Sequence, residues 1–283
     1  MITSWSPKIR SKVLSIGVVR AASRHLPRRR PIAVYELSGT FRLVGDIGSG
    51  VRTDNWFKSN LEDRFQWMAV PYKADFYPMK DSVEQGVTNL INHIDARKGP
   101  FVLVGYSQGA GIVANVYDVI RYGSLIPRRA DFLGGVVFGN PRRQAGHTFP
   151  HCPNPGGHGI AGDIAGADYL LSDCEELWWD FAARGDPVAC TPDSQAGQWQ
   201  SALYQTLLSN YRGDIHEMLA LVDNGIPNAM GLAHGIKNLF HGFVTSGAPH
   251  AQYQDSAYHP LPGDSRPCIA IARDYINSLG PRR

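Results

Sequence analysis

Long apolar runs are absent from this sequence of 283 residues. No stretch approaches the roughly 18–20 uninterrupted apolar side chains that a membrane-spanning helix needs. Glycine and proline are plentiful, but they show no repeat period, so a repeat architecture is not expected. The sequence therefore indicates a folded soluble protein, made of one large domain or of a domain with a substantial insertion.

Cysteine is scarce, and its positions match neither a zinc-binding template nor the C-x-x-C redox motif. One or two disulfides could form in an oxidising compartment, and buried free thiols are the alternative. We would test Cys174–Cys190 first, because this bond would brace the loop that carries Asp186. The histidines His147, His151 and His158 also lack the carboxylate or cysteine that would complete a known metal site, so we expect no metal and no cofactor. The four cysteines are Cys152, Cys174, Cys190 and Cys268.

Acidic side chains are absent from residues 1–30, which carry eight basic ones. Subtracting these eight from the 28 Lys and Arg leaves 20 against 25 Asp and Glu, so the rest of the chain has a balance of −5. We predict a basic arm that is solvated or tethers the protein to an anionic surface. The apolar run 13–19 is short and is followed at once by Arg20, so a signal peptide is not expected. Basic and aromatic residues are not interleaved as a nucleic-acid-binding face requires, so we expect no nucleic-acid partner.

From residue 31 onward, apolar runs typical of strands alternate with segments of helical periodicity. This alternation predicts an α/β fold with a central parallel sheet and crossover helices. In the segment 80–96, the predicted core face consists of Val83, Val87, Leu90, Ile91 and Ile94. The predicted strands are 31–37, 64–72, 101–104, 131–139 and 177–183, and the predicted helices are 80–96, 110–120 and 269–279.

Two later segments depart from this alternation. Residues 142–167 are rich in Gly, Pro and His and have no regular period, and such a loop in a compact domain is more often functional than idle. Residues of about 196–245 have helical character, and a second helix is expected there at 229–243. We therefore predict a basic arm at 1–30 and one α/β domain at 31–283, with a helical insertion at about 196–245.

The pentapeptide Gly105-Tyr106-Ser107-Gln108-Gly109 fits the G-x-S-x-G motif of a nucleophile elbow. A serine on this strained strand-to-helix turn needs small residues two positions before and after it. An apolar strand precedes the motif and a helix rich in Ala, Gly and Val follows, which is the context that the motif requires. We therefore predict Ser107 as a catalytic nucleophile. The backbone N–H of Gln108 would be one donor to an oxyanion, and Thr40, at the end of the first predicted strand, would supply the second.

The elbow indicates an α/β-hydrolase fold for the domain at 31–283, with the helical insertion beside or over its active-site face. An activated serine needs a base and an acid, which follow it in the order Ser, Asp, His in this fold. Asp186 lies just past a predicted strand, whereas Asp180 lies within it and is expected to point into packing. His250 and His259 are both candidates for the base, since both follow the helical insertion. We favour Asp186 and His250 and keep Asp180 and His259 as the alternatives.

The ordered set of motifs resembles the cutinase-like esterases, and more closely the lysin B enzymes of bacteriophages that infect mycobacteria and related actinobacteria. The likeness spans about residues 31–260. The motifs that carry it are Ser38-Gly39-Thr40, Gly105 to Ala110, Gly139 to Arg143, Trp178 to Asp186, and Pro249-His250.

The resemblance implies a mycolylarabinogalactan esterase, which cuts the ester that joins mycolic acids to arabinogalactan and detaches the outer membrane of the host late in infection. It carries the catalytic triad onto Ser107, Asp186 and His250, and the oxyanion donors onto Thr40 and Gln108. It also implies a phage-encoded protein that is made in the host cytoplasm and acts at the host cell envelope, with peripheral contact to the outer membrane or wall. We expect a lipid-ester or envelope-glycolipid substrate and a monomeric protein.

Two rival functions remain open at this point. A general cutinase or short-chain lipase would prefer cutin or tributyrin over cell-wall arabinogalactan. A catalytically inactive hydrolase fold could instead serve as a binding or virion module, and a fluorophosphonate probe would then fail to label Ser107.

Overall fold

The structure of the protein is a computed structural model, which describes residues 30–39, 53–75, 79–162, 170–174, 176–208, 249–253 and 258–280. The chain divides into residues 1–30 and a unit of residues 31–283, and both the sheet and the candidate site belong to the second. Thr40, the predicted helix at 229–243 and the predicted basic arm lie outside the described residues.

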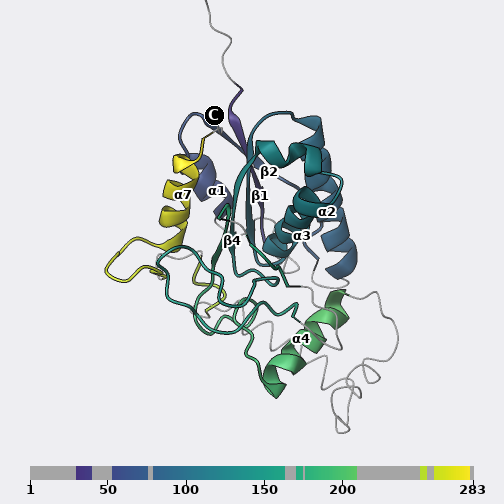
Figure 1. Ribbon diagram of the computed structural model, residues 1–283, viewed down its shortest axis with the longest axis vertical. Coiled ribbons are helices and arrows are strands. Elements are labelled where there is room, and N and C mark those ends of the chain that lie inside the picture. Colours follow the sequence, from purple (N-terminus) through teal and green to yellow (C-terminus); the bar gives the residue numbers. More distant parts are fainter. Residues whose placement is uncertain are drawn as a thin grey trace, which may run out of the picture. The chain divides into compact units, whose positions relative to one another are not determined.

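Within the described residues, parallel strands form one sheet in the order β2-β1-β3-β4-β5 (Figure 1). All the carboxyl ends of these strands therefore meet at one edge, where α/β proteins place their ligands. The prediction of a central parallel sheet is confirmed. The strands are β1 (Ile32–Leu37), β2 (Phe65–Ala69), β3 (Phe101–Tyr106), β4 (Phe132–Phe138) and β5 (Trp178–Phe181).

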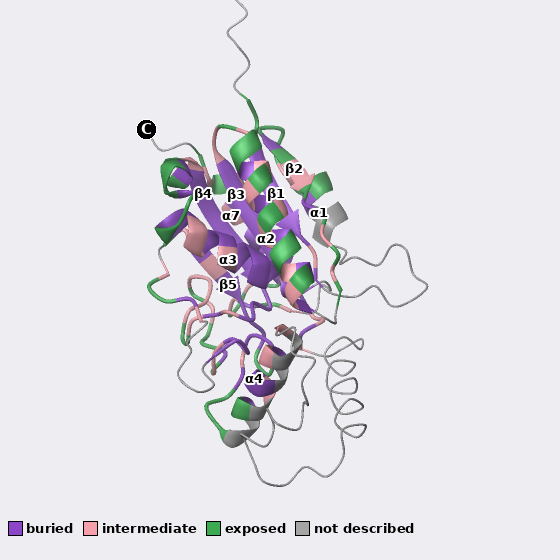
Figure 2. Cartoon of the chain, turned by 90° about the vertical axis from the view of Figure 1, so that its right-hand side faces the viewer, coloured by how far each residue is buried: buried purple, intermediate pink, exposed green. Residues whose placement is uncertain are grey.

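Helices cover both faces of the sheet. Helices α2 and α3 pack on one face, and α1 and α7 pack on the other (Figure 1). Helix α4 lies beyond the carboxyl ends of the strands in both views (Figure 1, Figure 2). No helix in the described ranges is long and apolar enough to span a membrane. The helices are α1 (Thr53–Asn60), α2 (Met79–Ala96), α3 (Gln108–Tyr122), α4 (Gln195–Leu208) and α7 (Cys268–Ser278), with a 3-10 helix η1 at Ile126–Asp131.

The central strands are buried on both faces, which explains their continuous apolar sequence. In β1, Ala33, Tyr35 and Leu37 join the core beneath α2 and α3, whereas Ile32 and Val34 join the core beneath α1 and α7. Figure 2 shows the buried strands between helices whose exposed residues face outward. Burial on both faces holds the sheet rigid under the site.

The core face of α2 differs from the predicted one at its first two turns. Leu90 and Ile94 are fully buried as expected, but the face continues through Ser82 and Gly86. A Cβ at position 86 would lie 2.5 Å from the Cδ1 atom of Ile112, so the absent side chain lets α2 and α3 approach closely. Apolar periodicity detects large side chains and overlooks such small ones. The other predicted residues are half-buried beside the same core: Val83, Val87 and Ile91.

Helix α1 is a further difference from the prediction, and η1 lies largely in the segment between the predicted helix 110–120 and the predicted strand 131–139. The sequence between the first two strands reads as a polar loop, but it contains α1, which inserts the fully buried Phe57 into the core.

The described part of the 142–167 segment has no helix or strand beyond an isolated bridge between His158 and Thr191, and its irregular character is confirmed.

Candidate active site

Ser107 occupies a sharp turn between β3 and α3. Its φ of 54° and ψ of −121° are strained values for a residue with a side chain. The flanking glycines are needed for steric reasons: a Cβ at Gly109 would lie 2.2 Å from the carbonyl oxygen of Leu37, and one at Gly105 would lie 2.7 Å from that of Gly109. The turn therefore depends on close approach of α3 to β1, with Ser107 at its apex.

The structure brings together the three residues favoured for the triad. Nε2 of His250 lies 2.8 Å from Oγ of Ser107, and Nδ1 lies 2.9 Å from Oδ1 of Asp186. A carboxylate only accepts hydrogen bonds, so Nδ1 carries the proton and the lone pair of Nε2 faces the serine hydroxyl. His259, the alternative base, is exposed.

Packing fixes the imidazole of His250, which is 3% exposed. The ring of Tyr106 stacks on it, with centroids 5.2 Å apart and an interplanar angle of 23°. The Tyr106 hydroxyl also donates to the backbone carbonyl of His250 at 2.7 Å. Gly139 has a φ of +57°, and a Cβ there would lie 2.7 Å from Cε1 of the imidazole. The residue before the serine thus holds the base both by its ring and by its hydroxyl.

Asp186 is fully buried at the turn after β5. Gly185, with a φ of +82°, begins this turn, and the N–H groups of Val188 and Ala189 donate to Oδ1 at 2.7 and 3.3 Å. Burial on its own would raise the pKa of Asp186, but the charge of His250 and hydrogen bonds from His250, Tyr253 and Val188 outweigh it, so that the pKa lies below its usual value. The carboxyl group is therefore held as an anion behind the imidazole.

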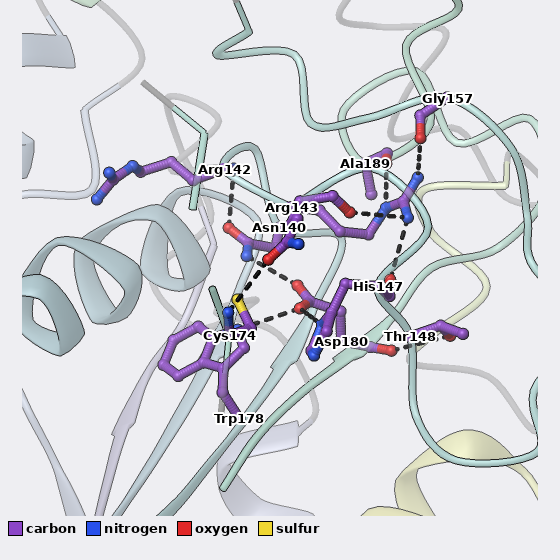
Figure 3. Close-up of polar contacts among 11 residues, drawn as sticks. Asn140, Arg142, Arg143, His147, Thr148, Gly157, Cys174, Trp178, Asp180 and Ala189 are labelled. Atoms are coloured by element: carbon purple, nitrogen blue, oxygen red, sulfur yellow. Dashed lines mark hydrogen bonds and ion pairs between the residues drawn. The ribbon is translucent and has the colours of Figure 1, made fainter. Parts of the chain in front are cut away.

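Asp180, the alternative acid, lies in a separate polar cluster (Figure 3). Its carboxylate accepts hydrogen bonds from Nδ2 of Asn140 at 2.8 Å and from Nε1 of Trp178 at 3.1 Å, and Nδ1 of His147 lies 2.8 Å away. Asp180 is fully buried, and its partners include neither Ser107 nor His250. Asp180 therefore lies among other polar partners, away from the candidate nucleophile and base.

Arg143 organises the loop beside the site, a role that the sequence did not predict although the residue belongs to the motif Gly139 to Arg143. Its guanidinium is buried and donates to the backbone carbonyls of Ala189, Gly157 and His147 at 2.6 to 3.0 Å (Figure 3), and to that of Gly156 at 2.6 Å. Because Ala189 belongs to the turn that holds Asp186, this arginine joins the irregular loop to the acid. The position of Arg143 directly after Asn-Pro-Arg gave no signal of this role.

Gln108 is anchored by its side chain as well as by its place in α3. Its Oε1 accepts from Oγ of Ser82 at 3.2 Å, and its Nε2 donates to the carbonyl of Asp75 at 3.0 Å. As the first residue of α3, it has a backbone N–H without an intrahelical partner. Thr40 lies outside the described residues, but a Cβ on the preceding Gly39 would lie 2.9 Å from Cβ of Ser107, so the chain passes directly beside the serine.

The cysteines are all free thiols, so Cys174 and Cys190 are not bonded to one another. Burial raises the pKa of Cys152 to about 11, and those of Cys174 and Cys190 to about 12. These groups stay protonated at neutral pH and do not act as nucleophiles. Within the described ranges, His, Cys, Asp and Glu side chains form no cluster of three that could hold a metal ion.

The arrangement at Ser107 suits one kind of chemistry. An imidazole that faces a hydroxyl and is backed by a buried carboxylate can take the hydroxyl proton and make the oxygen nucleophilic. The N–H at the start of α3 lies on the same turn, where a developing oxyanion needs a donor.

Comparisons with known proteins point to the same kind of chemistry. The cutinase family model matches residues 38–195. Endolysin B of Mycobacterium phage L5 is 30% identical over 179 residues, which cover 59% of this chain and 69% of the relative. Endolysin B of Mycobacterium phage D29 is 26% identical over 219 residues, which cover 71% of this chain and 85% of the relative. The crystal structure of lysin B from mycobacteriophage D29 aligns with a TM-score of 0.61 at 21% identity, covering 88% of this chain and 100% of that one. This likeness shows the α/β-hydrolase fold.

Proposed function

The chain belongs to the cutinase family and is a serine esterase of the lysin B type, and we propose that it hydrolyses the ester between mycolic acids and cell-wall arabinogalactan during phage-induced lysis. The observation that carries the proposal is the continuous chain of contacts from Ser107 through His250 to Asp186. The names and hosts of the phage relatives support the substrate.

In the proposed mechanism, His250 takes the proton of Ser107 while Oγ attacks the carbonyl carbon of the ester. Asp186 holds the imidazole in the required tautomer and stabilises its positive form. Collapse of the tetrahedral intermediate releases the sugar hydroxyl, which receives the proton from His250. Water then attacks the acyl-enzyme with the same histidine as base, and the free fatty acid leaves.

Two N–H groups would bind the oxyanion of the intermediate. The N–H of Gln108 is one, and its side-chain bonds to Ser82 and Asp75 hold that end of α3 in place. We assign the other to Thr40, because Gly39 lies against Ser107. Each donor would contribute about 2.7–4 kcal/mol to stabilisation of the transition state.

The reaction itself is tested by Ser107→Ala. Because the variant lacks the attacking oxygen, we expect its hydrolysis of p-nitrophenyl esters to fall by at least a hundredfold, with the fold intact by circular dichroism. A fluorophosphonate probe should label the wild-type protein and not the variant. A variant that keeps more than one part in a hundred of the activity would remove Ser107 from the nucleophile role.

The substrate requires a separate comparison. We expect the enzyme to release free mycolic acid from purified mycolyl-arabinogalactan, and Ser107→Ala to release none. The alternative is a general cutinase or lipase-like carboxylesterase, since the family also bears the name cutinase. Preferential turnover of cutin or tributyrin, without release of mycolic acid, would favour that alternative.

The site of action follows from the proposed substrate. We propose that the protein acts at the host cell envelope, with peripheral contact to the outer membrane or wall. The lipid-ester class of the substrate accords with the esterase family, and the excess of basic residues in the segment 1–30 supports contact with an anionic surface.

A further inference from the structure

The carboxylate of Asp186 has two oxygens with different partners. Oδ1 receives hydrogen bonds from His250 and from the backbone N–H groups of Val188 and Ala189. Among the described residues, Tyr253 alone donates to Oδ2, at a distance of 2.5 Å. One phenol therefore satisfies the oxygen that the histidine does not use.

The direction of this hydrogen bond is fixed by a second contact. The backbone N–H of Ala183, two residues after β5, donates to the Tyr253 hydroxyl oxygen at 2.8 Å. Since the phenol oxygen accepts this proton, its own proton is directed at Asp186. Tyr253 thus links the backbone beside β5 to the candidate catalytic acid.

The ring of Tyr253 is held as firmly as its hydroxyl. The side chain is fully buried, and it lies edge-on to the imidazole of His250, with centroids 6.1 Å apart and an interplanar angle of 87°. It also packs against Phe138 at 6.2 Å and edge-on against Tyr258 at 5.6 Å. A ring enclosed in this way cannot swing its hydroxyl away from Asp186.

The phenol is a donor that persists across the pH range of an enzyme assay. Burial, followed by the negative charge of Asp186, raises the pKa of Tyr253 well above its ordinary value. A buried carboxylate oxygen without a donor would be costly, and the group could lower that cost by turning away from His250.

We propose that Tyr253 is a positioning residue, which holds the Asp186 carboxylate, and through it His250, in the geometry for proton transfer from Ser107. The inference rests on the proposed function. In the part of the chain that the structure describes, the partners of the Tyr253 hydroxyl are Asp186 and the N–H of Ala183, and Ser107 is not among them, so it acts on the reaction through the aspartate. Its position three residues after His250 places both the base and the support of the acid in one short segment.

The test is Tyr253→Phe, which keeps the ring and removes the hydroxyl. With a soluble p-nitrophenyl ester we expect kcat to fall about tenfold, as for the loss of one hydrogen bond to a charged group, and KM to stay within about twofold. An undiminished kcat, or a change confined to KM, would overturn the proposal.

The pH profile separates positioning from packing. Without the phenol proton, more negative charge on Asp186 faces the imidazole, and this favours the imidazolium over the neutral base that takes the proton of Ser107. The low-pH limb of kcat/KM should therefore move upward in the variant. The other titratable or charged groups here are Tyr106 on His250, Cys190 on the carbonyl of Ala183 and Arg143 on the carbonyl of Ala189. They are the same in the wild type and in the variant. A loss of activity with an unmoved limb would mean a structural role and would overturn the proposal.

Tyr258→Phe is the matched control. The Tyr258 hydroxyl donates to the backbone carbonyl of Ala182 at 2.8 Å, one residue from the Tyr253 contact, and it makes no hydrogen bond to Asp186. We expect wild-type kcat and an unmoved pH limb. An effect on both equal to that of Tyr253→Phe would overturn the proposal, because loss of any nearby buried hydroxyl would then suffice.

A second variant keeps the test decisive if Tyr253→Phe fails to fold. Incorporation of 3-fluorotyrosine at position 253 keeps the ring and hydroxyl and makes the phenol a stronger donor. The low-pH limb should then move in the opposite direction, to lower pH. An unchanged limb would overturn the proposal.

Ser107→Ala in the same assay distinguishes failure of the esterase site from failure of the role of Tyr253. If that variant is inactive and Tyr253→Phe behaves as wild type, the esterase site stands and only the role of Tyr253 fails. If Ser107→Ala remains active, the proposed function fails and the role of Tyr253 fails with it.

Discussion

Two buried aspartates six positions apart, Asp180 and Asp186, have different hydrogen-bond partners in this protein. Asp186 is hydrogen-bonded to His250, whereas Asp180 accepts hydrogen bonds from Asn140 and Trp178 and contacts His147. Both are fully buried, so burial does not tell them apart. Their partners distinguish them, and substitution of each aspartate can measure this difference.

Asparagine at each position should separate stability from catalysis. Asp186→Asn can no longer hold the imidazole tautomer, and we expect kcat to fall by about ten-thousandfold. Asp180→Asn places an amide among hydrogen-bond donors, and we expect it to lower the free energy of unfolding by about 1–3 kcal/mol and leave kcat of the folded enzyme within about twofold. Urea melts and p-nitrophenyl ester kinetics on both variants check this. The reverse pattern would exchange the two roles.

The stability that Asp186 contributes should depend on pH. Its pKa is lower in the folded protein than the value of about 3.9 expected in the unfolded chain, so its contribution is complete above that value and is lost as the pH falls through the folded pKa. The difference in unfolding free energy between wild type and Asp186→Asn should therefore shrink below about pH 4. Urea melts at pH 7, 5 and 3 measure it, and a constant difference would contradict the assignment.

At the scale of elements, the elbow depends on how closely α3 approaches β1. The sequence motif identified the turn because G-x-S-x-G reports a local steric need. It did not reveal that Gly109 lies against the backbone of Leu37, which is 72 positions earlier in the numbering of the chain. The same limit explains the difference in α2, where Gly86 is a contact point with α3 that no periodicity of large residues could show.

Gly109→Ala should separate α3 from β1. The added Cβ would lie 2.2 Å from the carbonyl oxygen of Leu37, and backbone atoms cannot give way cheaply. We expect loss of esterase activity and a destabilisation of more than about 3 kcal/mol, beyond the usual cost of overpacking. Gly280→Ala is the control, because a Cβ there meets nothing within 4 Å. Equal melting temperatures for the two variants would show that the close approach of α3 to β1 does not require glycine at position 109.

At the scale of the whole molecule, the charge of the chain is divided unequally. The eight basic residues of the segment 1–30 precede a body with more acids than bases. If this segment is a tether, it should act on attachment to surfaces and not on the chemistry at Ser107.

Removal of residues 1–30 should therefore leave kcat on a soluble ester within about twofold and weaken binding to vesicles that contain anionic phospholipid. The difference in binding should vanish at about 1 M salt, where the screening length is about 3 Å. Co-sedimentation at low and high salt measures this. Equal binding of both proteins at low salt would remove the tether hypothesis.

The sequence alone predicted the parallel sheet and the elbow at Ser107, because these depend on local periodicity and on steric needs within a few residues. The order of the candidate nucleophile, acid and base came instead from the pattern of the α/β-hydrolase fold. Only the tertiary structure separated His250 from His259 and showed what surrounds Asp186. The pair Ser107 and His250 is separated by 143 positions in the chain, the pair Asp186 and His250 by 64, and the pair Asp186 and Tyr253 by 67. Such contacts depend on which loops the sheet brings to its carboxyl edge, and no local pattern in the chain records that.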